Sequence, residues 1–220
     1  MNALPFSFAG EPLAALPSGA LRWPARRLLC VSDLHLGKSE RMARRGGPIL
    51  PPYEAQETLA RLDADIRATD PRTVICLGDS FDDLDAMRAL EDGARALLAT
   101  LMAGRRWIWI EGNHDAGPVE LGGAHLAQHR EGALTFRHIA LPDAAGEVSG
   151  HYHPKARLQL RGRSLTRRCF LLDSARLILP AYGTYTGGLH CHADPLASLM
   201  APDAQAILLA DPPLAVPMPR

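Results

Sequence analysis

Short runs of apolar residues recur through the first half of the chain, and each run ends at a polar cluster. The runs Leu28–Val31, Thr73–Leu77 and Arg106–Ile110 are nearly continuous in apolar character. Continuous apolar runs of this length are typical of strands that are buried on both faces of a sheet. We therefore predict three buried strands in this half.

Two longer segments between these runs show the spacing of amphipathic helices. In 53–68, small or apolar residues recur at every third or fourth position, and Pro71 follows the segment. The segment 84–102 repeats this spacing and is followed by Gly104. Helices that alternate with parallel strands form right-handed βαβ units, so the three polar clusters should meet at one edge of a sheet.

The second half of the chain has a different pattern, with shorter apolar runs and no helical spacing from residue 134 onward. The predicted strands there are 134–138, 146–149, 157–160, 169–172, 177–179 and 206–209. We expect a mainly antiparallel sheet that faces the first one, within a single domain over residues 1–220. Residues 1–27 should add lead-in strands, with 21–23 at an edge, and the Pro-rich tail 212–220 should be loosely held.

The composition of the chain says more about where in the cell the protein works than about which reaction it catalyses. The 24 basic and 24 acidic side chains give no net charge, so contact with a polyanion must come from a local patch. The four cysteines are widely spaced and form no Cys-x-x-Cys pair, which argues against a disulfide framework or a structural zinc site. No apolar stretch approaches the ~18 residues of a membrane span. We expect a soluble, cytoplasmic protein with no membrane association.

Metal-binding residue types follow the predicted strands. The first strand ends in Asp33-Leu34-His35, and in extended backbone these two side chains would point the same way, toward one cation. With later loops, the candidate ligand set comprises Asp33, His35, Asp79, Asn113, His138, His151 and His153. Two divalent ions about 3.5–4 Å apart need a carboxylate between them, and we assign this position to Asp79.

The other ligands divide between the two ions. The first ion would take Asp33, His35 and His153, and the second would take Asn113, His138 and His151. Mixed oxygen and nitrogen ligands favour Mn²⁺, Fe²⁺ or Zn²⁺ over Mg²⁺ and Ca²⁺. A water that bridges two such cations becomes a hydroxide nucleophile near neutral pH, which suits hydrolysis.

Residues beside the ligands are candidates for supporting roles. His114 follows a ligand but is left without a metal, so we assign it to catalysis, as a donor to the leaving oxygen or a stabiliser of phosphoryl charge. Asp82 and Asp115 should hold ligands or backbone in place.

Basic residues flank both ends of the candidate site. The segment 38–52, a predicted loop or short helical turn, offers candidate contacts to substrate phosphate at Lys38, Arg41, Arg44 and Arg45. The alternative to phosphate contact is that these basic side chains are simply solvated on a surface loop. His190, in the Gly-rich loop 181–193, is a further candidate for the substrate cleft. A second basic group comprises Arg157, Arg161, Arg163, Arg167 and Arg168.

The ordered motifs resemble those of a known superfamily. Asp33-x-His35, Gly78-Asp79-x-x-Asp82, Gly112-Asn113-His114-Asp115, His138 and Gly150-His151-x-His153 look like the motif set of the calcineurin-like metallophosphoesterases. This resemblance implies a four-layer α/β/β/α sandwich of two mixed β-sheets.

A finer resemblance covers nearly the whole chain. The stretches 32–38, 51–54, 78–83 and 179–188 are similar to those of the bacterial ligase-associated DNA damage response endonucleases. The resemblance implies Mn²⁺-supported cleavage of phosphodiester bonds in DNA repair. It also implies a link to a DNA ligase, a helicase and an exonuclease of the same repair group. The oligomeric state, a homodimer included, and the choice between endonuclease and exonuclease stay open.

Two alternatives use the same ligands. The first alternative is a small-molecule or nucleotide-lipid phosphoesterase. UDP-diacylglucosamine pyrophosphohydrolases share the Gly-Asp-x-Phe-Asp stretch found here at 78–82. Those enzymes would be expected to have apolar insertions that face the membrane, and we find no clear one in this chain. A non-catalytic metal-binding scaffold for a repair complex is the other. Protein Ser/Thr phosphatases are disfavoured, since they continue the motif with Asp-Arg-Gly where this chain has Asp82-Asp83-Leu84.

Overall fold

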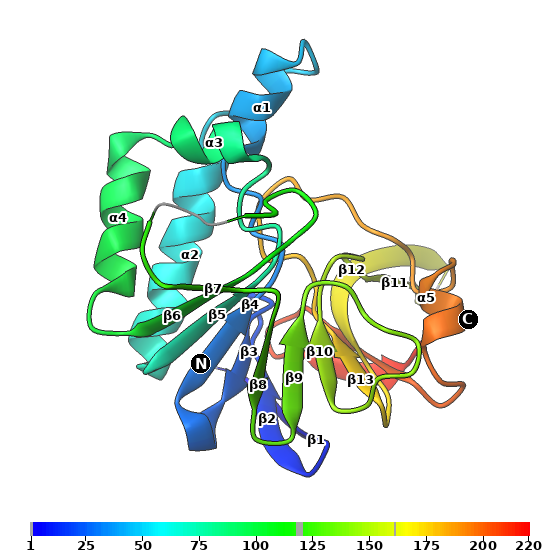
Figure 1. The fold of residues 1–220 in the computed structure, drawn as a ribbon. Coiled ribbons are helices and arrows are strands. Elements are labelled where there is room, and N and C mark those ends of the chain that lie inside the picture. The colour runs from blue at the N-terminus through cyan, green and yellow to red at the C-terminus, as the bar shows by residue number, and fades with distance from the viewer. Residues whose placement is uncertain (1, 118–120, 161) are drawn as a thin grey trace.

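Two β-sheets lie face to face in the computed structural model, which describes residues 2–117, 121–160 and 162–220 (Figure 1). The first sheet has seven strands in chain order, antiparallel up to the fourth and parallel from there on. These strands are β1 (Leu4–Phe8), β2 (Glu11–Ala15), β3 (Leu21–Trp23), β4 (Leu28–Val31), β5 (Thr73–Leu77), β6 (Arg106–Ile110) and β7 (Ala124–Leu126). The three predicted buried strands are therefore neighbours at its centre.

The second sheet is mixed. Its strands are β8 (Gln128–Glu131), β9 (Leu134–Arg137), β10 (Glu147–Ser149), β11 (Lys155–Leu160), β12 (Arg163–Leu172), β13 (Arg176–Ile178), β14 (Gln205–Leu208) and β15 (Leu214–Pro217). The order is β15-β14-β12-β13-β10-β9-β8, and β11 pairs with β12 outside this path. Strand β10 runs parallel to β9 and β13, whereas the other pairs are antiparallel.

Apolar side chains fill the space on both sides of each sheet. Leu77 and Ile108 of the first sheet meet Phe136 and Phe170 of the second in the central core. Helices α2 (Glu54–Thr69) and α4 (Asp92–Met102) pack on the outer face of the first sheet (Figure 1). On the outer face of the second, the one helix among the described residues is the short α5 (Leu196–Leu199). The expected sandwich of two mixed sheets is confirmed, with few helices outside it.

The predicted helix 84–102 is interrupted. It consists of α3 (Leu84–Arg88) and α4, with the Asp83 carboxylate accepting a hydrogen bond from Ala86 N at the start of α3. The guanidinium of Arg95 donates to the carbonyls of Met87, Arg88 and Leu90. These bonds satisfy carbonyls that a continuous helix would have used, and they explain the break.

The two ends of the chain both join sheets. Strand β3 lies between β2 and β4, so the expectation of an edge strand at 21–23 was wrong. The tail 212–220, which we expected to be loosely held, contains β15, which pairs with β14 along four residues. Met218 beyond it is 5% exposed. Apolar contact with the outer face of the second sheet holds this segment.

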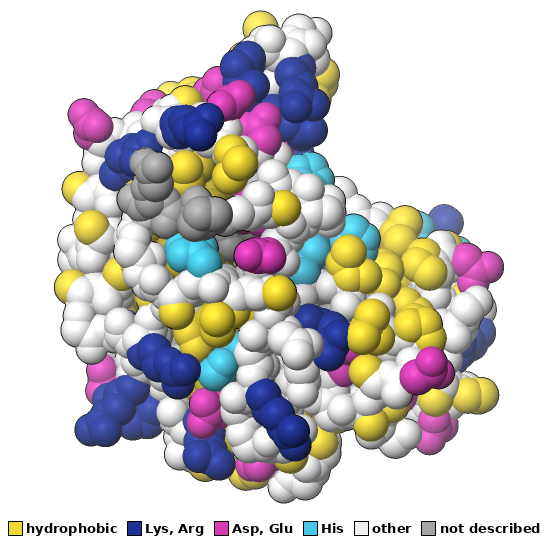
Figure 2. Space-filling view, in the orientation of Figure 1, with side chains coloured by type: hydrophobic (Ala, Val, Ile, Leu, Met, Phe, Trp, Pro, Cys, Tyr) yellow, Lys and Arg dark blue, Asp and Glu magenta, His cyan; other side chains and the backbone are white. Residues whose placement is uncertain are grey.

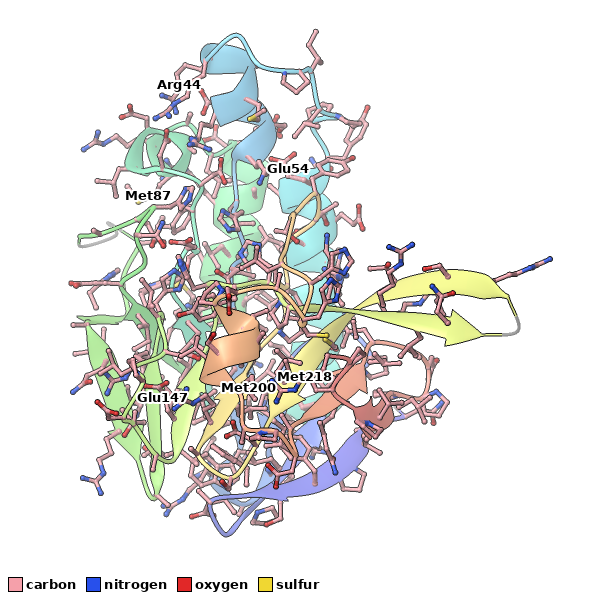
Figure 3. The ribbon with its side chains drawn as sticks, turned by 90° about the vertical axis from the view of Figure 1, so that its right-hand side faces the viewer. Arg44, Glu54, Met87, Glu147, Met200 and Met218 are labelled. Atoms are coloured by element: carbon pink, nitrogen blue, oxygen red, sulfur yellow. The ribbon has the colours of Figure 1, made fainter. Side chains whose placement is uncertain are left out.

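Two elements stand out from the sandwich. Helix α1 (Lys38–Arg44) projects above the site edge of the first sheet (Figure 1), and the β11–β12 hairpin projects from the second sheet (Figure 3). No helix in the described ranges is both long enough and apolar enough to cross a membrane.

Candidate metal centre

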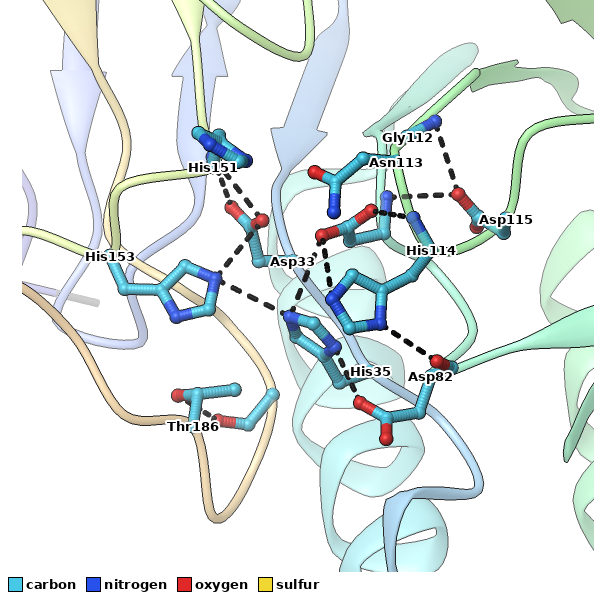
Figure 4. Close-up of polar contacts among 12 residues, drawn as sticks. Asp33, His35, Asp82, Gly112, Asn113, His114, Asp115, His151, His153 and Thr186 are labelled. Carbon is cyan, nitrogen blue, oxygen red and sulfur yellow. Dashed lines mark hydrogen bonds and ion pairs between the residues drawn. The ribbon is translucent and has the colours of Figure 1, made fainter. Parts of the chain in front are cut away.

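The predicted ligands come together where strand ends of both sheets meet (Figure 4). Asp33, Asp79 and Asn113 follow the carboxyl ends of the parallel strands β4, β5 and β6. His138 and His151 follow β9 and β10, which are also parallel to each other. Figure 2 shows histidine side chains at the surface between the two halves of the molecule.

The backbone at these ligands is left-handed, not extended. The φ angles are +53° at Asp33, +45° at His35, +47° at Asp79, +70° at His151 and +49° at His153. Residues other than glycine rarely adopt such φ angles. Those that do cluster at functional sites, where the surrounding structure holds the backbone in place. The premise that Asp33 and His35 converge because the backbone is extended was wrong, although both side chains reach the same group.

Backbone hydrogen bonds hold the first two ligand loops side by side. Asp33 N donates to Gly78 O at 3.2 Å, and His35 N donates to Asp79 O at 2.9 Å. Leu36 N continues the series by donating to Ser80 O at 3.0 Å. The two loops therefore form one unit that presents both carboxylates.

Two glycines let the backbone approach the ligands. A Cβ on Gly112 would lie 2.1 Å from Asp79 N and 2.2 Å from Asp79 Oδ1. A Cβ on Gly150 would lie 1.8 Å from Ser32 Oγ and 2.6 Å from Asp33 Oδ2. Both positions exclude any side chain, a constraint that the sequence signalled only by placing each glycine in a ligand motif.

The first candidate ion group is Asp33, His35 and His153, whose ligand atoms all lie within 4.8 Å of one another. Nε2 of His153 is 3.1 Å from Asp33 Oδ1 and 3.4 Å from Nε2 of His35. The backbone N–H of His151 donates to the Asp33 carboxylate at 3.0 Å and fixes its orientation. This is the grouping predicted for the first ion.

The second candidate ion group is Asp79, His138 and His151. Nε2 of His138 is 3.4 Å from Asp79 Oδ2, 3.3 Å from Nδ1 of His151 and 3.0 Å from Asn113 Oδ1. Asp79 Oδ2 also lies 3.9 Å from Nε2 of His35. The structure thus brings together all seven predicted ligands and puts Asp79 between the two groups.

The distances within the groups fit bound cations. Two imidazole nitrogens that bind one ion at about 2.1 Å lie roughly 3.0–3.4 Å apart. The pairs His35–His153 and His138–His151 have nitrogen separations of 3.4 and 3.3 Å. Asp33 and Asp79 are 0% and 2% exposed, so their charges lack water to compensate them. These residues fit two divalent metals.

Both buried carboxyl groups are ionised at neutral pH. Burial acts to raise the pKa of Asp79, but the hydrogen bond and charge of His138 hold that pKa well below its usual value. At Asp33, burial likewise acts to raise the pKa, and the hydrogen bond and charge of His153 bring it below its usual value. The site therefore concentrates negative charge where cations would bind.

Asp82 holds two histidines in place. Its Oδ1 is 2.8 Å from Nδ1 of His35, and its backbone carbonyl is 2.8 Å from Nδ1 of His114. These contacts leave Nε2 of each ring facing the centre. Burial acts to raise the pKa of Asp82, but the hydrogen bonds from His35 and Arg41 lower it to about 2.

Asp115 braces the backbone under Asp79. Its carboxylate accepts hydrogen bonds from the backbone N–H groups of Asp79, Ser80, Phe81 and Gly112, at 2.7 to 3.1 Å. Asp82 thus contacts two histidines and Asp115 contacts the backbone, and their supporting roles in the site stay a prediction.

His114 lies at the edge of the centre. Its Nε2 is 4.0 Å from Asp79 Oδ2, and its side chain is 30% exposed. A groove of about 430 Å³ is lined by the preceding residue Asn113 together with His138, Arg137 and Ile139, among others. Arg137 is a groove residue that the sequence did not indicate, because it belongs to no motif.

The basic residues of α1, and Arg45 directly after it, lie within ion-pair distance of carboxylates. Arg41 Nη1 donates to Asp82 Oδ2 at 2.7 Å, and Arg44 Nη2 donates to Asp83 at 2.8 Å. Lys38 Nζ lies 4.0 Å from Asp82, and Arg45 lies 3.6 Å from Asp83. Their contact with substrate phosphate stays a prediction.

His190 lies apart from the two ion groups. It forms an isolated bridge with Lys155, and its ring stacks on His192 with 5.3 Å between ring centroids. Its role in the substrate cleft also stays a prediction.

Comparison with known proteins agrees with this geometry. The model of the calcineurin-like phosphoesterase family matches residues 26–186. Among solved structures, the chain is similar to the nuclease MPE of Pseudomonas putida, with 30% identity and a TM-score of 0.73 over 97% of this chain and 100% of that one. This likeness supports the resemblance to the ligase-associated endonucleases. No curated protein matches significantly. The chain is therefore a hydrolase that belongs to the calcineurin-like phosphoesterase family.

Proposed function

We propose that this protein is a two-metal phosphodiesterase that cleaves nucleic acid, specifically DNA. The observation that carries the proposal is the position of Asp79, whose Oδ2 lies 3.9 Å from His35 Nε2 and 3.4 Å from His138 Nε2. A carboxylate between two groups of nitrogen and oxygen ligands is what a pair of ions requires. When bound, two Mn²⁺ ions would activate a water and neutralise charge on the phosphoryl oxygens.

The protein's own residues orient the reaction. Asp33 and Asp79 hold the negative charge that attracts the ions, and Asp82 fixes the rings of His35 and His114. Because Nδ1 of His114 donates to the carbonyl of Asp82, the Nε2 of the doubly protonated ring can donate a proton to the leaving oxygen or a hydrogen bond to the phosphoryl group.

Two observations support a nucleic acid as the substrate. The similar structure with 30% identity is that of a nuclease. The groove beside Asn113 and His138 is open and about 430 Å³ in volume, which offers room for a nucleotide next to the metal centre.

We infer from the motif resemblance that the protein works with the DNA ligase, helicase and exonuclease of a repair group. A cytoplasmic location fits the four cysteines, which are buried and free of disulfides. A homodimer is compatible with both the repair partners and the cytoplasmic location, but neither of these depends on it.

A panel of substrates tests the proposal. Protein loaded with Mn²⁺ should hydrolyse bis-p-nitrophenyl phosphate and DNA, and should hydrolyse p-nitrophenyl phosphate, a monoester, more slowly. Turnover of small diesters without cleavage of single-stranded, nicked or duplex DNA would favour a small-molecule phosphoesterase. No turnover with Mn²⁺, Fe²⁺ or Zn²⁺ would favour a metal-binding scaffold.

A further inference from the structure

The ligands of the first candidate ion group come from two different sheets. Asp33 and His35 follow β4 of the first sheet, whereas His153 precedes β11 of the second. These ligands can share one ion only if the two segments keep a fixed position relative to each other. A third segment of the chain, residues 182–189, contacts both and is here called the bridging loop.

The beginning of the bridging loop is bonded to the segment of Asp33. Tyr182 N donates to Ser32 O at 2.8 Å, and Gly183 N donates to Asp33 O at 3.0 Å. A Cβ on Gly183 would lie 2.1 Å from the carbonyl oxygen of Leu34, so only glycine allows this approach. The loop therefore lies directly against the backbone that presents the Asp33 carboxylate.

The end of the bridging loop is bonded to the segment of His153. Leu189 N donates to Tyr152 O at 3.2 Å, and a Cβ on Gly188 would lie 2.1 Å from His153 O. Figure 4 shows Thr186, from the middle of the loop, on the side of the site where His153 lies. One loop thus joins both ligand segments of the first candidate ion group.

Two arginines, one from each half of the fold, hold the carbonyls at the start of this loop. Arg61 of α2 donates from Nη1 to Tyr182 O at 2.6 Å. Arg168 of β12 donates from Nη1 to Ala181 O at 2.9 Å and to Gly183 O at 3.3 Å. Burial and the charge of Arg61 lower the pKa of Arg168. Charge-assisted hydrogen bonds to three successive carbonyls offset the repulsion between these like charges.

Arg61 also reaches the next residue of the loop. Its Nη2 donates to Thr184 Oγ1 at 3.1 Å and to the Glu57 carboxylate at 3.2 Å. Thr184 N donates in turn to Thr58 Oγ1 at 3.1 Å. Helix α2 therefore holds the bridging loop at two successive residues, through an arginine side chain of which only 23% is exposed.

We propose that Arg61 is a positioning residue for the first ion, acting through the bridging loop on the segments of Asp33 and His153. This inference rests on the two-ion centre of the proposed function and concerns which residues set its geometry. Removing a group that orients metal ligands typically weakens metal affinity by roughly 10–100-fold. Between residues that the structure describes, no hydrogen bond joins the bridging loop to the segments of Asp79 or His138. Loss of Arg61 should therefore weaken the first ion more than the second.

Calorimetric titration of the full chain with Mn²⁺ tests the inference. Arg61→Ala removes the guanidinium that holds the bridging loop. Arg67→Ala is the matched control, because both arginines of α2 pair with a carboxylate four residues earlier in the helix. The Arg67 side chain is 78% exposed, so its removal measures the loss of a helical ion pair alone.

Two backgrounds separate the ions. His138→Ala lacks a ligand of the second ion and keeps the first candidate ion group, whereas His153→Ala does the reverse. In His138→Ala, we expect Arg61→Ala to weaken binding of the remaining ion about tenfold. In His153→Ala, the same change should stay within about twofold, and Arg67→Ala should stay within about twofold in both backgrounds.

A merely structural role would affect both ions alike. Equal weakening by Arg61→Ala in the two backgrounds, or binding indistinguishable from that of Arg67→Ala, would therefore overturn the inference.

Thr184→Val supplies a second test, which holds even if Arg61→Ala fails to fold. It removes only the hydroxyl that accepts the hydrogen bond from Arg61. We expect about threefold weaker binding in His138→Ala and no change in His153→Ala. The same affinity with and without Thr184→Val in His138→Ala would also overturn the inference.

Wild type judges the proposed function separately. Turnover of bis-p-nitrophenyl phosphate with Mn²⁺, together with equal affinity of Arg61→Ala and Arg67→Ala, would remove the inference and leave the proposed function standing. Absence of both Mn²⁺ binding and turnover in wild type would remove both.

Discussion

At the level of single residues, the site depends on backbone conformations that residues other than glycine rarely adopt. Asp33, His35, Asp79, His151 and His153 all have positive φ, and such residues cost on the order of 1–3 kcal/mol each unless their surroundings hold them. Hydrogen bonds between the loops after β4 and β5 provide that hold at Asp33, His35 and Asp79, and His151 N–H donates to the Asp33 carboxylate. The ligand atoms are therefore positioned by the backbone before any ion binds.

Replacing His114 tests its assignment as the proton donor. We expect His114→Ala to reduce the turnover of DNA by about 10²–10⁴-fold, because the leaving oxygen would lose its donor. Binding of Mn²⁺, measured by calorimetry, should be retained, since Asp82 and Asp79 keep their other contacts. A loss below about tenfold would remove His114 from catalysis.

Protonation of His138 should compete with metal binding. Burial acts to lower the pKa of His138, but Asp79 and Asp33 raise it from 6.5 to about 9 in the metal-free protein. The charged form thus stabilises the metal-free fold below pH 6.5, and this contribution is lost as the pH rises through 9.

A metal needs the neutral ring, so binding at pH 7.5 should release a proton and should tighten as the pH rises. Calorimetric titration with Mn²⁺ in two buffers of different ionisation enthalpy measures this release. Equal heats in both buffers would contradict the assignment.

At the level of elements, some features could be predicted from the sequence and others could not. The runs that form β4, β5 and β6 are continuous because both faces of these strands are buried, so a local pattern reports them. Strand β8 was missed because Gln128, His129 and Arg130 are polar, and only pairing with β9 makes them a strand. The break between α3 and α4 depends on the contacts of Arg95, which no spacing reveals.

The ligand set shows the same division. Asp33, Asp79 and Asn113 were found because each follows a predicted parallel strand, which fixes their common edge. The second sheet contributes His138, His151 and His153. How this sheet packs against the first depends on tertiary contacts, which no local sequence pattern reports. Their grouping could be proposed only from donor chemistry and motif order.

Asp83 ties α1 to α3. It accepts from Ala86 N at 2.7 Å and from Arg44 Nη2 at 2.8 Å. We expect Asp83→Ala to lower the free energy of unfolding by about 1–2 kcal/mol, because a helix cap is lost and Arg44 is left with fewer partners.

Asp85→Ala, in the first turn of the same helix at a side chain that is 63% exposed, should cost less than about 0.5 kcal/mol. Urea unfolding of both variants measures the difference. Equal losses would show that Asp83 is an ordinary surface charge.

At the level of the whole molecule, the metal centre joins the two sheets. The candidate ligands lie in loops that follow β4, β5 and β6 of one sheet and β9 and β10 of the other, so bound ions would stabilise the sandwich as well as the loops. Ligand at 100 times its Kd adds about 2.7 kcal/mol of stability. For a domain of this size we expect saturating Mn²⁺ to raise Tm by about 5–10 °C relative to chelator.

Scanning calorimetry with Mn²⁺ or with chelator checks this coupling. The variant Asp33→Asn should show less than half of the shift, because one ion loses a charged ligand. A wild-type Tm that is the same in both conditions would mean that the ions do not bind the folded centre.

Cleavage of plasmid DNA by Asp79→Asn tests the central claim most directly. Asp203→Asn, at an exposed carboxylate away from the site, serves as the matched control. With Mn²⁺, we expect wild type and the control to cleave DNA and Asp79→Asn to lose at least about 10³-fold of that rate, while keeping its far-ultraviolet circular dichroism spectrum. Cleavage by Asp79→Asn near the wild-type rate would contradict a two-metal site joined at Asp79.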